Sequence, residues 1–379
     1  MKRLPLTMPA VLLLFIAGCG GTVTPDATLA QRSFYMGFTP WPYDATPAAY
    51  TTTYDKLNAD GDMVDHQLMQ GIPWEEAYTG TAYPSAVEND LSGRLSLTNA
   101  DKVIFLAIDS LNPARDGLAN NWGANGEEPR SGAWASLDFD SREVIDAYVN
   151  FASDLIDRFQ PAYFNYATEA SELILKDLTT FNKFKVFAQE VYNRLKARYP
   201  DLKLLFSISL KSPGSSEMTL VKTNIADILQ YVDVIGVSVY PYIFFNHADK
   251  GNPANLPANW LSQITDIAPG KPIVITETGW IAETLVLNLS NPNITITVNS
   301  NESYQKAYVT ELLEESNRLG VEFVIWWSII DFQALWEGAL MQDEVAAIWR
   351  DIGLYDEQVQ ARPGLAVWRS FLARERIRD

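Results

Sequence analysis

Short apolar and β-branched runs recur along the chain, separated by longer segments with helical spacing. Eight runs have the length of a buried strand, and they lie at 33–39, 61–69, 102–109, 162–169, 202–210, 232–240, 272–277 and 321–328. Apolar residues return with a helical period over 144–159, 181–199, 303–319 and 365–376. Pro200 and Gly320 stand where two of these helices should end. This alternation predicts an α/β protein with a parallel sheet.

Eight strands that alternate with helices favour a (β/α)8 barrel, the TIM barrel, as a single domain over residues 33–379. The alternative is a doubly wound open sheet, but no G-x-G-x-x-G or G-x-x-x-x-G-K-[ST] motif follows any of the runs. Two connections, 110–142 and 281–301, are too long for plain turns, and the second alternates like a hairpin. Both follow a strand, so in a barrel both would lie on the face that carries binding sites.

The amino-terminal residues have the pattern of an export signal. Lys2 and Arg3 precede an apolar run that is too short to span a bilayer, so we expect residues 1–18 to be a signal peptide. The sequence "IAGC" resembles the bacterial lipobox, which implies lipidation of Cys19; an ordinary signal peptide with an incidental cysteine is the alternative. Residues 19–32 would then be the lipidated cysteine and a flexible tether. We therefore expect a lipid-anchored protein of the bacterial cell envelope, on its periplasmic or cell-surface side.

Composition and charge narrow the chemistry. The 379 residues are 47% hydrophobic, and the net charge of −18 becomes −20 without Lys2 and Arg3. Nucleic acid and anionic polysaccharide are therefore poor partners, and a neutral substrate is easier to accommodate. The two histidines, His66 and His247, have no metal-ligand spacing, and no G-x-S-x-G motif exists. Carboxylates remain as candidates, with no metal and no organic cofactor implied.

Two predicted strands end in a glutamate. "AYFNYATE" ends at Glu169 and "PIVITE" ends at Glu277. Because side chains alternate along a strand, Asn165 and Glu169 share one face, and the opposite face carries bulky aromatics that suit the helix side. Two carboxylates across a barrel mouth suit glycoside hydrolysis, and in the retaining reaction they stand about 5–5.5 Å apart. The alternative for either glutamate is a solvated residue or a partner of a helix cap.

Three motifs resemble glycoside hydrolase clan A, the retaining (β/α)8 glycosidases. "VITETGW" resembles the clan's nucleophile strand, and "VEFVIWWSIIDF" resembles its eighth strand. "VDVIGVSVYPY" resembles its sixth strand, especially in family 53 β-1,4-galactanases and family 17 β-1,3-glucanases. The resemblance implies that Glu277 is the nucleophile, that Glu169 is the acid/base, and that Tyr240 contacts the nucleophile. It also implies that a tryptophan of the eighth strand floors the subsite beside the cleaved bond.

The fourth strand departs from the clan pattern. The clan has Asn-Glu at this point, and the asparagine holds the sugar 2-hydroxyl, whereas this chain has Thr168-Glu169. We expect Asn165 to substitute in part from one layer below, and Glu172 is the alternative acid.

Aromatic residues are the remaining candidates for sugar binding. Eleven tryptophans are present, and sugar rings stack on aromatic faces. Five of them follow or end predicted strands and would share one rim, namely Trp41, Trp74, Trp280, Trp326 and Trp327. Trp280 is the best platform by position, whereas Trp349 and Trp368 suit helix packing. His66 is expected either to support the site or to be a structural residue.

The sequence thus predicts a retaining glycoside hydrolase that cleaves a neutral β-linked polysaccharide, with endo action. A β-1,3-glucan is favoured as substrate, followed by a β-galactan. A non-catalytic glycan-binding lipoprotein on a degenerate barrel is one alternative, with Thr168 marking the loss of activity. A transglycosylase that uses the same residues is the other.

Overall fold

The computed structural model describes residues 31–290 and 293–377, so Cys19 and most of the expected tether lie outside the described residues. All eight predicted strands are present in one parallel sheet. Its strands are β2 (Tyr35–Thr39), β3 (Met63–Leu68), β4 (Val103–Ile108), β7 (Tyr163–Asn165), β8 (Lys203–Leu205), β9 (Ser207–Ser209), β10 (Ile235–Val239), β11 (Ile273–Thr278) and β14 (Phe323–Ser328).

The sheet closes into a barrel through its fifth predicted strand. The strand order is β8-β7-β4-β3-β2-β14-β11-β10-β9. The two end strands, β8 and β9, are consecutive pieces of one run and are separated only by Phe206. Since β8 pairs with β7 and β9 pairs with β10, this run joins the two edges. The predicted (β/α)8 barrel is confirmed.

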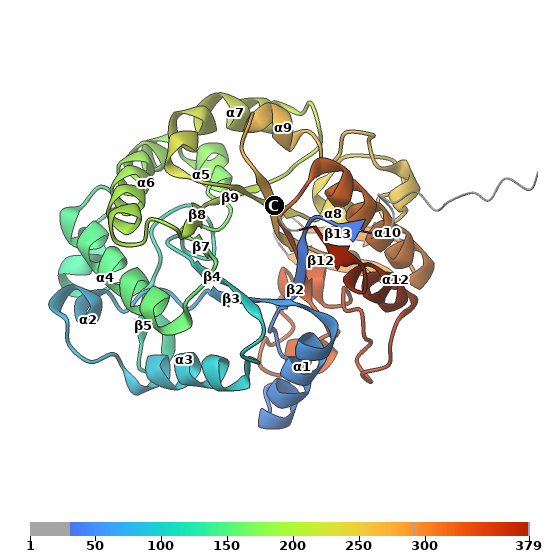
Figure 1. Cartoon of the computed structure of the whole chain (residues 1–379), viewed down its shortest axis with the longest axis horizontal. Coiled ribbons are helices and arrows are strands. Elements are labelled where there is room, and N and C mark those ends of the chain that lie inside the picture. Colours follow the sequence, from blue (N-terminus) through green and yellow to red (C-terminus); the bar gives the residue numbers. More distant parts are fainter. Residues whose placement is uncertain (1–30, 291–292, 378–379) are drawn as a thin grey trace, which may run out of the picture.

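Helices surround the barrel (Figure 1). They are α1 (Pro47–Asp60), α2 (Trp74–Thr79), α3 (Ser85–Leu97), α4 (Arg142–Phe159), α5 (Ser171–Lys176), α6 (Leu178–Arg198), α7 (Ser216–Ile225), α8 (Pro241–Phe244), α9 (Ile264–Ile267), α10 (Glu302–Leu319), α11 (Gln333–Glu337) and α12 (Pro363–Leu372). The four predicted helices correspond to α4, α6, α10 and α12. Gly320 caps α10 in the left-handed conformation, as its position predicts. Among the helices of the described residues, none has both the length and the apolar character to cross a membrane.

Both long connections carry extra structure after the strands that precede them. Residues after β4 form a small hairpin, β5 (Asn121–Gly123) with β6 (Gly126–Glu128). Residues after β11 form the predicted hairpin, β12 (Leu285–Ser290) with β13 (Asn293–Val298). At the other end of the barrel, β1 (Gln31–Arg32) pairs with β15 (Glu375–Arg376), so the last predicted helix ends earlier than the periodicity suggests.

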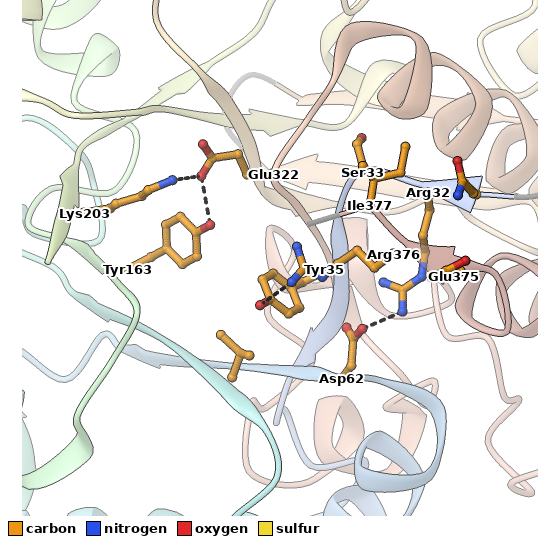
Figure 2. Close-up of a pocket in the computed structure, with 12 residues that line it drawn as sticks. Arg32, Ser33, Tyr35, Asp62, Tyr163, Lys203, Glu322, Glu375, Arg376 and Ile377 are labelled. Atoms are coloured by element: carbon orange, nitrogen blue, oxygen red, sulfur yellow. Dashed lines mark hydrogen bonds and ion pairs between the residues drawn. The ribbon is translucent and has the colours of Figure 1, made fainter. Parts of the chain in front are cut away.

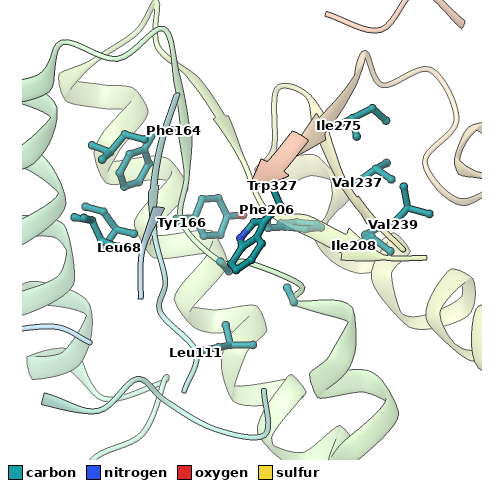
Figure 3. Close-up of a cluster of buried hydrophobic side chains, with 14 of the residues drawn as sticks. Leu68, Leu111, Phe164, Tyr166, Phe206, Ile208, Val237, Val239, Ile275 and Trp327 are labelled. Carbon is teal, nitrogen blue, oxygen red and sulfur yellow. The ribbon is translucent and has the colours of Figure 1, made fainter. Parts of the chain in front are cut away.

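The core has two layers, on the two faces of the sheet. Side chains that fill the barrel interior are Met63, Phe105, Ala107, Tyr163, Leu205, Val234, Val274, Phe323 and Ile325. The larger layer lies between sheet and helices and includes Phe164, Tyr166 and Phe206 (Figure 3). The outward position of Phe164 and Tyr166 is the alternation expected of their strand.

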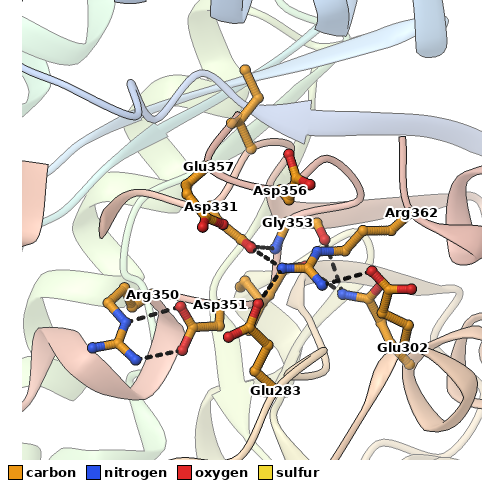
Figure 4. A network of polar contacts seen from close by, with 12 residues as sticks. Glu283, Glu302, Asp331, Arg350, Asp351, Gly353, Asp356, Glu357 and Arg362 are labelled. Carbon is orange, nitrogen blue, oxygen red and sulfur yellow. Dashed lines mark hydrogen bonds and ion pairs between the residues drawn. The ribbon is translucent and has the colours of Figure 1, made fainter. Parts of the chain in front are cut away.

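A buried guanidinium joins the loops after β11 and β14. Arg362, at the start of α12, is 4% exposed and forms an ion pair with Asp331 (Figure 4). The same guanidinium reaches Glu283 at 2.9 Å and Glu302 at 3.0 Å. Replacing Arg362 with methionine leaves Asp331 buried without its counter-charge, and we expect a loss of about 3–5 kcal/mol in the free energy of unfolding.

Urea denaturation at neutral pH measures this loss. Burial raises the pKa of Asp331 well above its ordinary value, so its protonation at lower pH should reduce the deficit of the variant. Arg318→Met is the matched control, because the Arg318 side chain is 61% exposed and pairs along α10 with Glu315. Its cost should stay below about 1 kcal/mol. Equal losses in the two variants would contradict a structural role for the buried pair.

Candidate active site

Glu277 faces the barrel interior because the strand that carries it is irregular. In the pairing of β11 with β10, Ile275 lies opposite Val237 and Glu277 lies opposite Ser238, so Thr276 is skipped. Val274 is an interior residue, so strict alternation would have turned Thr276 inward and Glu277 toward the helices. The irregularity reverses this and directs the carboxylate into the mouth.

Two side chains hold the Glu277 carboxylate. Gln67, near the end of β3, donates its amide to Oε1 at 2.9 Å, and the Tyr240 hydroxyl donates to Oε2 at 3.4 Å. Burial and the nearby charge of Glu169 raise the pKa of Glu277 well above its ordinary value, and Arg115 opposes this rise.

Glu169 reaches the mouth from an irregular segment rather than from a strand. The strand β7 ends at Asn165, four residues earlier than Glu169, which corrects the predicted strand end. Glu169 has φ +55, in the left-handed region that non-glycine residues seldom occupy. Its backbone N–H donates to Ser207 Oγ at 2.8 Å, and its Oε1 accepts from Ser238 Oγ at 2.8 Å. The fold therefore fixes both the backbone and the carboxylate of this residue.

One strand contacts both glutamates. Ser238 and Tyr240 lie two residues apart on one face of β10 and its end, where Ser238 donates to Glu169 and Tyr240 donates to Glu277. The two carboxylates thus lie over the same end of the barrel interior. The structure brings together the two acids that the sequence singled out, and Tyr240 contacts one of them, Glu277.

Two cations accompany the glutamates. Arg115, in the loop after β4, forms an ion pair with Asp109 and places Nε 3.4 Å from Glu169 Oε2. Lys211, just after β9, lies 2.8 Å from Glu172 and 3.0 Å from the Ser209 hydroxyl. Burial alone would raise the pKa of Glu169, but the charges of Arg115 and Lys211, together with the hydrogen bonds from Ser238 and Arg115, leave that pKa below its ordinary value.

Three tryptophans form an aromatic wall that reaches Tyr240, and we use that name for Trp41, Trp327 and Trp349. The Trp327 ring centroid is 5.0 Å from that of Trp41 and 6.0 Å from that of Trp349. The Trp349 ring lies 5.7 Å from the ring of Tyr240, which contacts Glu277. The indole N–H groups of Trp41 and Trp349 have no hydrogen-bond partner among the described residues. Trp349 therefore belongs to the site region, although its sequence position indicated helix packing.

The other predicted aromatic and imidazole side chains lie in the layer between sheet and helices. Trp280 is fully buried, stacks on Tyr308 at 4.5 Å and donates to Gly251 O, and Trp326 donates to Ile352 O. Both indoles are therefore engaged away from the carboxylates. Alternation along β14 explains Trp326, since its neighbour Ile325 points into the barrel.

Trp74 and His66 are also placed outside the site. Trp74 stacks on Trp134 and donates to backbone carbonyls of the loop after β4. His66 packs against Phe159, 5.1 Å between ring centroids, and contacts Thr98. The structure thus gives His66 the structural position that the sequence left open.

Asn165 precedes Glu169 by four residues, and its side chain contacts the segment that connects the two residues. Its Oδ1 accepts from the backbone N–H of Ala167 at 3.1 Å, and its amide nitrogen lies 3.5 Å from Thr168 Oγ1. Asn165 is 1% exposed. This position supports the segment that carries Glu169, and the predicted contact of Asn165 with a sugar hydroxyl stays a prediction.

A cavity of about 1190 Å³ lies at the opposite end of the barrel (Figure 2). Its lining includes Tyr35, Tyr163 and Lys203, which begin their strands. Glu322 in this cavity accepts from Lys203 at 2.6 Å and from Tyr163 at 2.8 Å, so its charge is balanced. Because barrel active sites are built at the carboxyl ends of the strands, we assign the candidate site to the end with the two glutamates.

The Tyr240 hydroxyl offers a test of the site geometry. Tyr240→Phe removes a donor to Glu277 and should lower kcat by about 10-fold, since one hydrogen bond to a charged group contributes ~1.5–3 kcal/mol. Tyr242→Phe is the matched control, because that hydroxyl donates to Ile348 O and does not reach the glutamates. Rates of sugar release and unfolding temperatures of both variants distinguish a loss of catalysis from a loss of stability. A similar fall in kcat for both would contradict the special position of Tyr240.

Comparisons with known proteins place the fold among glycosidases. No family model matches the chain, and no curated protein matches it. Solved structures do match, and the resemblance to glycoside hydrolase clan A is confirmed at the level of the fold. They include a GH53 catalytic domain, from the family that the sixth-strand motif resembles.

Three of these structures show the extent of the likeness. The exo-β-1,4-mannosidase Op5Man5 from Opitutaceae bacterium strain TAV5 is 14% identical to this chain, with a TM-score of 0.60. The match covers 92% of this chain and 62% of the mannosidase chain. The Ignisphaera aggregans GH53 catalytic domain is 14% identical, with a TM-score of 0.54, and the match covers 85% of this chain and 88% of that domain. Xylanase 10B from Thermotoga maritima is 13% identical, with a TM-score of 0.57, and the match covers 91% of this chain and 96% of the xylanase chain. This chain thus spans less than two thirds of the mannosidase, and these likenesses show the shared fold.

Proposed function

We propose that this protein is a retaining glycoside hydrolase that cleaves a β-linked, neutral polysaccharide. The observation that carries the proposal is the pair of contacts from β10, by which Ser238 holds Glu169 and Tyr240 holds Glu277 over the same end of the barrel. Two carboxylates facing one space are the groups that this reaction requires. The glycosidase fold of the structural neighbours supports the same reaction class.

The reaction takes two steps. Glu277 attacks the anomeric carbon, the bond from that carbon to the leaving oxygen breaks, and Glu169 gives its proton to this oxygen. In the second step, Glu169 takes a proton from water, the water oxygen attacks the anomeric carbon, and the bond to Glu277 breaks. Gln67 and Tyr240 hold the nucleophile in place, and their hydrogen bonds favour its charged form.

The surroundings support a neutral polysaccharide as substrate. The aromatic wall offers apolar faces for sugar rings, and the hairpins β5–β6 and β12–β13 extend the carboxyl-end face of the barrel. The net charge of −18 disfavours a polyanion. We favour endo action on a β-1,3-glucan, with a β-1,4-galactan next, because the motifs of the sixth and seventh strands resemble enzymes with these substrates.

A panel of polysaccharides tests the proposal. The purified chain is incubated with β-1,3-glucan, β-1,4-galactan, β-mannan and xylan, and products are followed by reducing-sugar release and proton NMR. We expect oligosaccharides whose first-formed anomer is β, since two displacements retain configuration. An α anomer would exclude the retaining reaction. Binding without release indicates a glycan-binding lipoprotein, and longer products indicate a transglycosylase.

We also propose that the protein is lipid-anchored through Cys19 on the bacterial cell envelope. The described chain begins at β1, which pairs with β15 beside the cavity at the amino end of the barrel. A tether attached there would leave the end with Glu277 facing away from the membrane. Metabolic labelling with a fatty-acid analogue, compared between the wild type and Cys19→Ser, tests the anchor. Equal labelling of the two would refute it.

A further inference from the structure

Arg115 reaches the candidate site from a compact loop that no sequence motif marks. It lies between β4 and β5 and has φ +56, a left-handed conformation that costs energy in a residue with a side chain. The loop is closed by hydrogen bonds from Asn112 N to Gly117 O and from Arg115 N to Asn112 O, both 2.9 Å. Lys176 of α5 donates to Ala114 O from outside. The loop thus holds the Arg115 side chain toward the barrel mouth, where it is 15% exposed.

The Arg115 guanidinium has one firm partner and one weaker one. Its Nη1 pairs with Asp109, a residue 2% exposed that also accepts from Leu111 N at 3.1 Å. Its Nε lies 3.4 Å from Glu169 Oε2. Asp109 therefore anchors the guanidinium, which leaves its Nε beside the Glu169 carboxylate.

The charges around Glu169 conflict with one step of the proposed reaction and favour the other. The groups that face Glu169 are Arg115 and Asp109 from the loop after β4, Lys211 after β9, Tyr240 after β10, and Glu277 on β11. In the first step Glu169 must hold a proton, which the negative charge of Glu277 favours and the two cations oppose. Once Glu277 is an uncharged ester, its negative charge no longer favours the protonated form of Glu169. The two cations remain, together with Asp109, which is paired with Arg115, and Glu169 must then act as a base.

We propose that Arg115 is a positioning residue that keeps Glu169 as a carboxylate for the second step, so that it can accept the proton of the attacking water. The inference rests on the proposed retaining reaction. Lys211 is a second cation near Glu169, but Glu172 and Ser209 already bind it. Arg115 is the cation that touches the Glu169 carboxylate directly.

Arg115→Gln should change the two steps in opposite directions. Without the guanidinium the pKa of Glu169 rises, so the acid stays protonated to higher pH, and the basic limb of kcat/KM should move up by about one pH unit. With an aryl glycoside whose leaving group needs no proton, the second step limits kcat. The acidic limb of kcat should then move up by about one pH unit, so that kcat falls about 10-fold at pH values below that limb. Arg115→Lys keeps the positive charge and should restore most of both properties.

The matched control is Arg142→Gln, because the Arg142 side chain is 91% exposed on α4 and pairs along that helix with Asp146. This variant should keep the wild-type pH profile. Thermal unfolding of all three variants verifies folding. If the wild type is active and Arg115→Gln has an unchanged basic limb and an unchanged kcat on the aryl glycoside, the inference is overturned.

A readout that needs no activity separates this inference from the proposed function. Carbon-13 NMR of labelled glutamate carboxyl groups follows the titration of Glu169, identified by the signal that Glu169→Gln removes. We expect the titration of Glu169 to move to higher pH in Arg115→Gln and to stay near the wild-type position in Arg115→Lys. Unchanged titration overturns the inference even where the wild type cleaves glycans. If the titration of Glu169 shifts in Arg115→Gln but the wild type cleaves no glycan, the proposed function is wrong. The role of Glu169 as a base is then wrong as well.

Discussion

Replacing Glu277 with glutamine should lower kcat on the preferred glycan by at least about 10³-fold, equivalent to ~4 kcal/mol of transition-state stabilisation. Glutamine keeps the size of the side chain and can still accept one of the hydrogen bonds from Gln67 and Tyr240, but its amide cannot form the covalent intermediate. Binding of the glycan should be retained, because the aromatic wall is unchanged. Reducing-sugar release and isothermal titration measure the two properties. Equal sugar release by the wild type and this variant would contradict the proposed role of Glu277 in hydrolysis.

The same substitution should not destabilise the fold at neutral pH. Burial and Glu169 raise the pKa of Glu277 in the folded protein above its unfolded value. The folded state then binds more protons between these two values, so its stability falls as pH rises through this interval. Glutamine removes that loss, and we expect the unfolding temperature of Glu277→Gln to equal or exceed that of the wild type at pH 7. The advantage should disappear near pH 4.

Glu322→Gln is the matched control for Glu277→Gln. Glu322 borders the barrel at its opposite end and is engaged by Lys203 and Tyr163 (Figure 2). The loss of its charge should lower the unfolding temperature and leave kcat unchanged. Glu277→Gln should therefore lose activity and keep its stability, whereas Glu322→Gln should lose stability and keep its activity. A loss of activity in Glu322→Gln comparable to that of Glu277→Gln would contradict the assignment of the site to the carboxyl ends of the strands.

The barrel could be predicted because its signals are local. Each strand is a short apolar run, and each helix has a period that a single window of sequence displays. The outward side of Phe164 and Tyr166 follows from the same alternation, which also directs Asn165 inward. Closure was also predictable, since eight strands with intervening helices complete a ring. The assignment of the two glutamates to one end of the barrel was predictable from these local features, because each ends a predicted strand.

The remainder of the site depends on contacts that no window of sequence contains. The inward turn of Glu277 requires the irregular pairing of β11, since simple alternation from Val274 would turn it outward. Trp280 comes two residues after β11, which carries Glu277, yet Tyr308 of α10 stacks on it in the core. Trp349 comes from a segment 21 residues beyond the last barrel strand and still reaches Tyr240. Tertiary packing decided each of these positions.

Arg115 illustrates the same limit for charges. Its partners Asp109 and Glu169 are separated from it by 6 and 54 residues, and only the folded loop brings the three groups together. Asp109 did have a sequence signal, because it ends its predicted strand as the two glutamates end theirs. An acidic residue at a strand end is thus a better guide to the site than a tryptophan near one.

Glu169→Gly should make the rate depend strongly on the leaving group, the second large effect that we expect. On a polysaccharide, whose leaving oxygen needs a proton, kcat should fall by at least about 10²-fold, as the contribution of a general acid implies. On an aryl glycoside with a good leaving group, the first step should persist, and added azide should replace water and yield a glycosyl azide of β configuration. Azide needs no base, so it should restore turnover.

Glu172→Gln decides between the two candidate acids. Glu172 lies on α5 and pairs with Lys211 at 2.8 Å, so its removal should leave the dependence on the leaving group unchanged and should give no azide product. Glu169 is held by Ser238 and by Arg115 at the mouth, where a leaving oxygen would meet it. If azide instead rescued Glu172→Gln and left Glu169→Gly inactive, the acid/base would be the residue on the helix. The departure at Thr168 from the clan pattern would then mark a relocated acid.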